Sequence, residues 1–274
     1  MKKLSILFLF ALFITIFSAC KRTQGCTDPN SLNYNLEAKK EDGSCLAPEQ
    51  TQNLLLFKLT GVKCGACGYS STITKEVKEQ YTENMFSIYL HCGVGDELNT
   101  GSKLKTIMPA NGGIPKHYLN NELENYTSLE AAIAPKLQNI PEGATVGQMS
   151  IEGNTLSVKT STMFFEDVEG TYELGVYLVE NGIAAEGSLA QSGNYDPEFV
   201  HNHVYRKSLN SNGIGDELTT GEISKDTPYF QDFEIEINEE WNKDNLEVVL
   251  VLWESDNALS NYRFINVNKA VILN

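Results

Sequence analysis

The sequence predicts an α/β domain followed by an antiparallel β-sandwich, and two observations predict it. Between residues 54 and 137, short apolar runs with the length of buried strands alternate with segments of helical period. From Val146 onward, apolar residues instead alternate with polar or small ones, which is the period of strands that bury one face. The chain of 274 residues is long enough for two domains with a core each.

The chain begins with a segment typical of a targeting signal. Two lysines precede a mostly apolar stretch, residues 4–17, which is too short to span a bilayer as an ordinary helix. We interpret residues 1–19 as a signal peptide. The stretch leads into Ser18-Ala19-Cys20, which resembles the lipobox of bacterial lipoproteins, although Phe17 stands where leucine is more usual. Lipid on Cys20 would anchor the protein to a membrane without spanning it. The alternative is simple cleavage that leaves a free Cys20.

The charge of the chain argues against one class of partner. Removal of residues 1–19 takes away two lysines and no acid, which changes the net charge of −15 to −17. A nucleic acid would be repelled by that balance, because its backbone is negatively charged. We therefore expect no nucleic-acid partner, and the acidic surface identifies no other ligand.

Residues 20–50 are predicted to form an anchor and a small disulfide-bonded segment. The segment is polar and has no apolar period, and Cys26 and Cys45 bracket it. A disulfide between them would hold so small a module together and would contribute about 3 kcal/mol. The pattern resembles short cysteine-bounded segments of many bacterial surface proteins. Asp28, Asn30 and Asp42 have the oxygen ligands that calcium prefers, but such residues are also turn formers, and we favour that interpretation.

The α/β domain is expected over residues 51–140. The apolar run Leu54–Leu59 is predicted to be a buried strand that leads into Cys64 and Cys67. A helix is expected next, because Ile73, Val77 and Tyr81 recur at a spacing of four. The remaining expected elements are a strand at 86–90, a partly helical stretch at 100–108, a strand at 116–119, a turn at Asn120-Asn121 and a helix at 129–137 capped by Ser128.

The β-sandwich domain is expected over residues 145–274, after a linker at 140–145. Gly153-Asn154 and Asn181-Gly182 are tight-turn signals. Leu246–Trp253 is apolar on both faces, as expected of a central strand. The alternating runs are Leu156/Val158, Tyr172/Leu174/Val176/Leu178 and Phe233/Ile235/Ile237. Many short strands without a convincing helix favour an antiparallel β-sandwich.

The α/β domain resembles thioredoxin-like proteins in the order of its elements. A strand leads into the C-x-x-C motif of Cys64 and Cys67, a helix and a parallel strand follow, and Pro115 precedes another strand. Ile114-Pro115 falls where the thioredoxin-like fold places a cis-proline beside its dithiol. The resemblance implies a thioredoxin-like domain followed by the β-sandwich.

Further motifs extend this resemblance into the second half of the chain. They are Thr60-Gly61, His91, Gly113-Ile114-Pro115, VYLVENG (176–182), Gln191, FVHNHVYRKSLN (199–210) and GIGDEL (213–218). Over residues 53–274 the chain resembles the family of outer membrane protein 28, bacterial envelope proteins with a thioredoxin-like domain and a β-sandwich. The resemblance implies an outer-membrane location and an adhesion-type role.

The sequence departs from these families where chemistry would matter. Before Thr60-Gly61 the family usually has acidic residues, but this chain has Phe57 and Lys58. Lys63 replaces the aromatic residue that is common before the first cysteine, and Ala66 replaces the proline often found inside the motif. The missing acid removes the usual proton acceptor for resolving a mixed disulfide, whereas Lys63 would lower a thiol pKa through its charge.

The cysteines of the α/β domain permit more than one function. Cys64 and Cys67 at a helix start are either a redox pair or an inert structural disulfide, because export favours oxidation and the helix dipole favours thiolate. Cys92 follows the neighbouring strand and is expected at the same sheet edge, as a bystander thiol, a third redox thiol or a metal ligand. Zinc would need a fourth ligand, and His91 points to the opposite face of the strand from Cys92.

Two histidines are weaker candidates for a metal site. His201 and His203 on one strand would lie on the same face, about 6.5 to 7 Å apart between Cα atoms, with Asp196 or Glu198 as possible helpers. Hydrogen-bonded packing is the alternative that we favour, and we expect no metal and no other cofactor.

The sequence thus predicts an outer-membrane lipoprotein that acts as a binding or adhesion module. Its partners would be the membrane, through lipid on Cys20, and a protein or surface ligand. The alternative is an envelope thiol–disulfide oxidoreductase, in which Cys64 attacks, Cys67 resolves and Pro115 shapes the substrate groove.

Overall fold

The computed structural model describes residues 23–108, 112–194, 196, 198–256 and 261–272. The expected signal peptide, residues 1–19, and the expected lipidation site Cys20 lie outside these residues. Within the part described, no helix is long and apolar enough to cross a membrane.

The first half contains the strands and helices that the sequence predicts. β1 (Leu54–Thr60) and β2 (Met85–His91) are parallel, and α1 (Gly65–Gln80) connects them. β3 (Lys116–Leu119) runs antiparallel to β1 and pairs with the short β4 (Glu122–Glu124). The other elements are a 3-10 helix (Lys103–Thr106) and α2 (Leu129–Leu137). The peptide bond between Ile114 and Pro115 is cis, as the resemblance implies.

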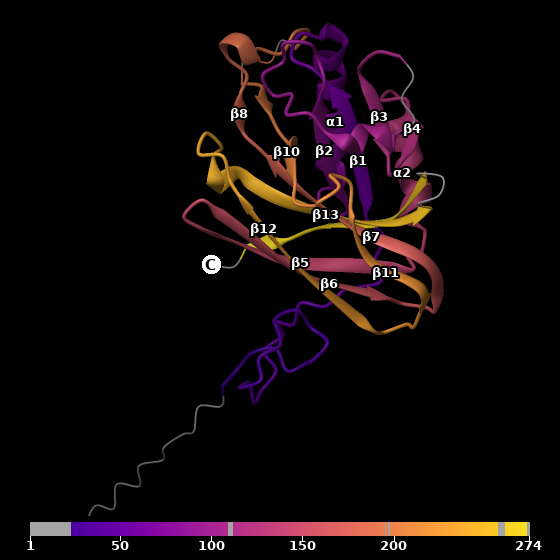
Figure 1. Cartoon of the computed structure of the whole chain (residues 1–274). Helices are drawn as coiled ribbons and strands as arrows, with labels where there is room; N and C mark the ends of the chain where they lie inside the picture. The colour runs from indigo at the N-terminus through magenta and orange to yellow at the C-terminus, as the bar shows by residue number, and fades with distance from the viewer. Residues whose placement is uncertain (1–22, 109–111, 195, 197, 257–260, 273–274) are drawn as a thin grey trace, which may run out of the picture.

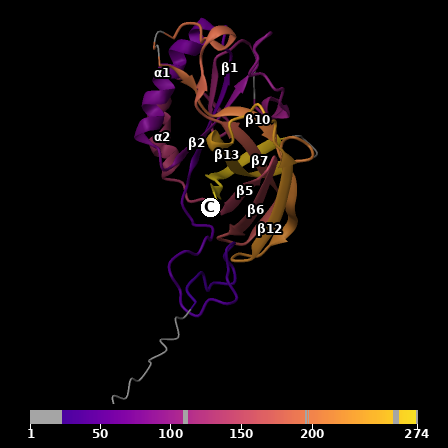
Figure 2. The same cartoon turned by 90° about the vertical axis from the view of Figure 1, so that its left-hand side faces the viewer.

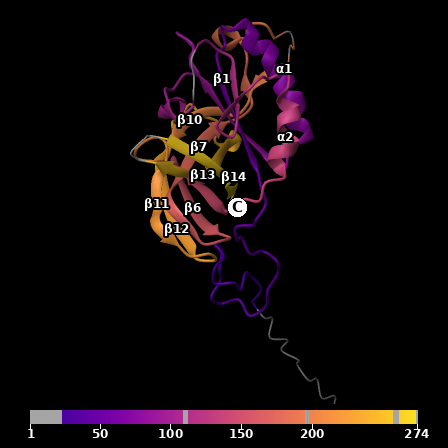
Figure 3. The same cartoon turned by 90° about the vertical axis from the view of Figure 1, so that its right-hand side faces the viewer.

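Both helices lie on the same face of the sheet that contains β1 and β2 (Figures 2 and 3). The buried face of α1 differs from the predicted one, because Thr74 is buried there and Ile73 is only half-buried. The residues that α1 buries are Cys67, Gly68, Ser70, Thr74 and Val77, which are mostly small. Ser128 is the N-cap residue of α2, as predicted, but its side chain makes no cap hydrogen bond and donates instead to the Asn125 carbonyl.

The second half contributes strands to two facing sheets. A four-stranded sheet has the order β12-β6-β5-β15, and the larger sheet has the order β14-β13-β7-β10-β2-β1-β3-β4, with β11 paired to β7. The strands are β5 (Gly143–Glu152), β6 (Thr155–Phe164), β7 (Val168–Glu180), β10 (Val204–Ser208), β11 (Asp216–Ile223), β12 (Pro228–Glu236), β13 (Leu246–Asp256), β14 (Asn261–Lys269) and β15 (Val271–Ile272). A cluster that includes Val158 of β6, Val176 of β7 and Leu250 of β13 packs between the two sheets.

The large sheet runs through both halves of the chain (Figure 1). β10 lies parallel to β2, where Val204 pairs with Tyr89, and the Tyr89 amide donates to the His203 carbonyl at 2.7 Å. The two expected domains, residues 51–140 and 145–274, are therefore joined by backbone hydrogen bonds. The fold is rich in β-structure and has several sheets.

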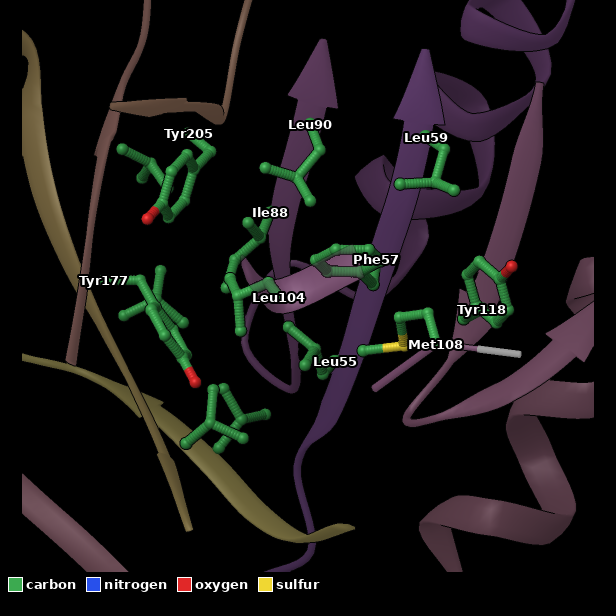
Figure 4. Close-up of a cluster of buried hydrophobic side chains, with 14 of the residues drawn as sticks. Leu55, Phe57, Leu59, Ile88, Leu90, Leu104, Met108, Tyr118, Tyr177 and Tyr205 are labelled. Atoms are coloured by element: carbon green, nitrogen blue, oxygen red, sulfur yellow. The ribbon is translucent and has the colours of Figure 1, made fainter. Parts of the chain in front are cut away.

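The largest apolar cluster also draws on both halves (Figure 4). Phe57 and Ile88 come from β1 and β2, whereas Tyr177 and Trp253 come from β7 and β13. All four side chains are completely buried. Burial of one such side chain is worth about 1.5–3 kcal/mol, so separating the halves would expose a substantial part of the core.

Residues 23–50 lie at the end of the molecule opposite α1 (Figure 1). Cys26 and Cys45 are joined by a disulfide, as predicted. Asp28 accepts hydrogen bonds from the Asn30 amide and the Ser31 hydroxyl, and Asp42 accepts one from the Ser44 amide. These side chains therefore stabilise turns, as the favoured interpretation requires.

Candidate functional site

The disulfide between Cys64 and Cys67 lies at the start of α1, and its two sulfurs differ in exposure. Cys64 is the N-cap of the helix and is half-buried, whereas Cys67 is completely buried. The Cys67 amide donates to Cys64 Sγ at 3.2 Å. No acidic residue lies in the first turn of α1, so the positive end of the helix dipole faces Cys64 without a compensating charge.

Pro115 lies close to this pair, because the loop before β3 reaches the helix start. The carbonyl oxygen of Ile114 is 3.7 Å from Cys64 Sγ. The predicted site residues Cys64, Cys67 and Pro115 are thus gathered at one edge of the sheet.

Lys58 lies behind the pair, on the face of β1 that α1 covers. Its side chain is 1% exposed, and its Nζ donates to the Ser71 hydroxyl at 2.7 Å. Ser71 in turn donates to the Cys67 carbonyl at 2.8 Å. Loss of hydration on burial lowers the pKa of Lys58 to about 7. Phe57, the other residue that stands where the family usually has an acidic one, belongs to the large apolar cluster.

A loop from the second half of the chain packs on the motif. The Gln191 amide Nε2 lies within hydrogen-bond distance of the carbonyls of Gly61 (3.1 Å), Val62 (3.2 Å) and Cys64 (3.3 Å). The Ser192 amide also donates to the Val62 carbonyl, at 2.7 Å. The loop therefore fixes the backbone that leads into Cys64.

Two glycines allow this contact. A Cβ on Gly193 would lie 2.1 Å from the carbonyl oxygen of Gly65, and one on Gly68 would lie 2.2 Å from the carbonyl oxygen of Ser192. Because both clashes are with backbone, only glycine fits at these positions.

Cys92 is the free thiol of the described residues, and it lies at the same sheet edge. Its amide donates to the Thr60 carbonyl at 3.0 Å, and its side chain packs against the large apolar cluster. Burial raises the pKa of this thiol, which is the behaviour of a bystander cysteine.

His91 lies on the other face of β2, as predicted, and pairs with a residue that the sequence analysis missed. Its Nδ1 is 2.9 Å from Asp96 Oδ2, and both side chains are buried. Asp96 also accepts hydrogen bonds from the Val62 and Leu98 amides. The single indication in the sequence is the short separation of the two residues after a predicted strand.

The structure separates the predicted pair of His201 and His203. β9 (Val200–His201) ends at His201, and His203 has a φ of 55°, so the two residues do not lie on one continuous strand. The His201 ring packs on His91, with 5.4 Å between centroids, whereas the His203 ring packs on Tyr89 at 5.5 Å. Burial lowers the pKa of His203 to about 3, so this imidazole is neutral at physiological pH.

A cavity of about 270 Å³ lies between α1, the sheet and residues 191, 196 and 198–203. Its lining includes the buried side chains of Lys58, Thr60, His91, Gln191 and His201. At its mouth, the exposed residues include Asp196 and Glu198.

Among the described residues, one group of three possible metal ligands lies close together, namely Cys26, Glu41 and Cys45. Because the two cysteines are joined in a disulfide, neither has a thiolate to bind an ion. This group is therefore not a metal centre.

Of three similar solved structures, the first shares the fold of most of this chain. HBP35 of Porphyromonas gingivalis is 14% identical, with a TM-score of 0.67, over 82% of this chain and 76% of that chain. A protein of Agrobacterium tumefaciens is 10% identical, with a TM-score of 0.49, over 81% of this chain and 96% of that chain. A domain of the outer membrane lipoprotein Omp28 from Porphyromonas gingivalis is 13% identical, with a TM-score of 0.31, over 49% of this chain and 90% of that chain.

Comparison with families identifies the chain. No match is found among curated proteins. The model of one family, described as outer membrane protein Omp28, matches residues 110–274, which is more than half of the chain. The chain therefore belongs to the Omp28 family of outer membrane proteins and is a protein of the cell envelope.

Proposed function

We propose that this protein carries out thiol–disulfide exchange in the envelope, through Cys64 and Cys67 at the start of α1 in a thioredoxin-like half. One observation carries the proposal. The sulfur of Cys64 is in a half-exposed residue at a helix start, whereas Cys67 behind it is completely buried. An attacking thiol must be reached by its substrate, and a resolving thiol needs to reach only its partner.

The surroundings of Cys64 favour its reactive form. In the reduced protein the Cys67 amide and the helix N-terminus would stabilise a thiolate on Cys64, and the charge of Lys63 beside it would do the same. The order of β1, α1, β2 and β3 supports the thioredoxin-like interpretation of this half.

The exchange itself needs no group outside the pair and its substrate. The Cys64 thiolate attacks one sulfur of a substrate disulfide, so that a mixed disulfide forms and the other substrate sulfur leaves as a thiolate. The Cys67 thiol passes its proton to the substrate thiolate released in the first step and attacks Cys64 Sγ, which closes the Cys64–Cys67 disulfide and releases the second substrate sulfur. The substrate gains two electrons and two protons, and the pair is oxidised.

We expect this exchange to be slow. A buried ionisable group beneath the pair is Lys58, whereas a carboxylate there would accept the proton that Cys67 releases. A protonated lysine accepts no proton, so resolution of the mixed disulfide lacks an efficient base below about pH 7.

The test is reduction of the purified chain by dithiothreitol, followed by an insulin-reduction assay. We expect dithiothreitol to reduce the pair in the folded protein and insulin reduction to be measurable but slow. Cys64→Ser should abolish turnover, and Cys92→Ser, as the matched control, should leave it unchanged. A pair that dithiothreitol cannot reduce without unfolding, or turnover that survives in Cys64→Ser, would contradict the proposal.

A binding or adhesion role is the second candidate, favoured by the loop that packs on the motif. Gln191 and Ser192 fix the backbone before Cys64, which suits a rigid surface with a structural disulfide. If the disulfide is only structural, the double variant Cys64→Ser/Cys67→Ser should have a lower melting temperature than the wild type. The wild-type chain should then show no thiol–disulfide exchange activity.

A further inference from the structure

Two of the four histidines of the chain come together on the wall of the cavity, apart from the dithiol. His91 at the end of β2 and His201 at the end of β9 are 5% and 4% exposed. Their ring centroids are 5.4 Å apart, and the ring planes are inclined by 76°. Both side chains line the cavity.

The hydrogen bonds of each ring determine which nitrogen is left free. Asp96 Oδ2 and the Leu189 carbonyl are acceptors, so Nδ1 of His91 donates to the first and Nε2 of His201 to the second, at 2.9 and 2.8 Å. In a neutral imidazole the other nitrogen then has a free lone pair. Nε2 of His91 and Nδ1 of His201 have no hydrogen-bond partner among the residues that the structure describes.

This arrangement is typical of histidines that bind metal ions. A ligating histidine usually donates its second ring N–H to a carboxylate or a backbone carbonyl, which holds the ring and fixes its tautomer. His91 has the first kind of partner and His201 the second. In tetrahedral geometry with metal–nitrogen bonds of about 2.0–2.1 Å, two imidazoles on one ion have centroids roughly 5 Å apart. The observed separation of the two ring centroids, 5.4 Å, is close to this distance.

We propose that His91 and His201 form a two-histidine site for a divalent transition-metal ion in this cavity. Imidazole nitrogen suits zinc, copper and nickel. The described residues contain no third side-chain ligand grouped with both histidines within 4.8 Å. The remaining positions would therefore be taken by water and, after side-chain rotation, by Asp196 or Glu198 from the mouth of the cavity.

The positive charge of Lys58 should weaken the binding of this ion. Its side chain lines the same cavity, and a protonated amine there repels a cation. The hydrogen bond to Ser71 holds Nζ toward α1. Lys58→Met should therefore bind the ion more tightly than the wild-type chain does.

The test is titration of the purified, disulfide-intact chain with Zn²⁺ by calorimetry. We expect one Zn²⁺ per chain, with affinity lowered about 10–100-fold or more in His91→Ala and His201→Ala, because losing a ligand costs at least as much as losing its hydrogen-bond partner. His117→Ala, at a buried histidine of β3 that does not line the cavity, and His203→Ala, at a histidine that does, are matched controls and should bind as the wild type does. Cys92→Ser, which removes the free thiol, should also bind normally.

A second measurement uses the wild-type chain, so it does not depend on how well the variants fold. The histidine ring nitrogens are followed by NMR while Zn²⁺ is added. Zn²⁺ should perturb Nε2 of His91 and Nδ1 of His201 and spare both nitrogens of His203. Absence of stoichiometric binding, binding that survives in both His91→Ala and His201→Ala, or binding lost in Cys92→Ser would overturn the proposal. So would binding of inorganic phosphate in the cavity without binding of Zn²⁺, since this would indicate an anion site around Lys58.

Discussion

The Gln191 side-chain amide lies 3.1 Å from the carbonyl oxygen of Gly61, although 130 residues separate the two in the chain. Through this contact and the neighbouring one to Val62, the second half of the protein fixes the backbone just before the Cys64–Cys67 disulfide. The Cys64–Cys67 disulfide and the β-rich half are therefore in direct contact, and variants of either should affect the other.

Gln191→Ala tests this connection. The substitution removes the side-chain hydrogen bonds to the carbonyls of Gly61 and Val62, which should lower the free energy of unfolding by about 0.5–1.5 kcal/mol. It should also speed reduction of the Cys64–Cys67 disulfide by dithiothreitol, because the loop over the motif loosens. Urea unfolding and a thiol-trapping time course measure the two effects. Gln138→Ala at an exposed position is the control, and equal effects of the two substitutions would refute the role of Gln191.

A comparison of Gly193→Ala with Gly101→Ala distinguishes the effect of backbone strain from that of the close approach to Gly65. Gly193 and Gly101 have nearly the same φ, 72° and 69°, but a Cβ on Gly101 would meet nothing within 4 Å. Gly101→Ala should therefore lower the free energy of unfolding only by the penalty of the left-handed conformation, roughly 1–2 kcal/mol. Gly193→Ala should cost clearly more, because its Cβ would collide with the Gly65 carbonyl. Equal losses of stability in chemical denaturation would show that the close approach is unimportant.

Lys58→Met should stabilise the protein in a pH-dependent way. Burial lowers the pKa of Lys58 to about 7 in the folded state, against 10.5 as its ordinary value, so the unfolded chain binds the proton more readily. Protonation therefore destabilises the folded state. This loss of folding stability is fully present below pH 7, where it is on the order of 5 kcal/mol at most, and it vanishes as the pH rises to about 10.5.

The stability gained by Lys58→Met should accordingly be large at pH 6 and small at pH 10. Urea unfolding at the two pH values measures it, with Lys159→Met, at an exposed position, as the control. A gain that does not change with pH would mean that Lys58 is not a desolvated amine in the folded protein.

Cys92 should react slowly with alkylating agents. Burial raises the pKa of its thiol, so little thiolate is present at pH 8. After reduction by dithiothreitol, iodoacetamide should label Cys64 well before Cys92. Peptide mass spectrometry follows both sites in the same sample, and the slow label should disappear in Cys92→Ser. Labelling of Cys92 as fast as Cys64 would be the contrary result.

Cys20 should carry lipid in the mature protein. The short apolar stretch and Ser18-Ala19-Cys20 predict cleavage before this cysteine and its acylation. Mass spectrometry of the mature N-terminus should find a diacylated or triacylated Cys20, and the protein should fractionate with membranes. Cys20→Ser should release it from them, whereas an unmodified Cys20 in the wild type would disprove the anchor.

Local pattern in the sequence determined the elements and both disulfides. The apolar run that starts at residue 54 predicts β1 closely, and the segment 129–137 predicts α2. Both could be predicted because the periods of strands and helices depend on neighbours a few residues away. The disulfides Cys26–Cys45 and Cys64–Cys67 were predictable for a similar reason, since a short loop keeps its ends within reach. The same local reasoning was correct for Val77 on α1 and wrong for Ile73, because Thr74 is buried in its place.

Only the tertiary structure decided how the two halves meet and which side chains share a site. The pairing of β10 with β2, the contact of Gln191 with the motif and the approach of His201 to His91 join segments far apart in the chain. No sequence period marks such contacts, because they depend on which sheet edge and which core face the folded chain brings together. His201 therefore lies against His91 and not beside His203, its neighbour in sequence, since the backbone turns away at His203 after β9 ends.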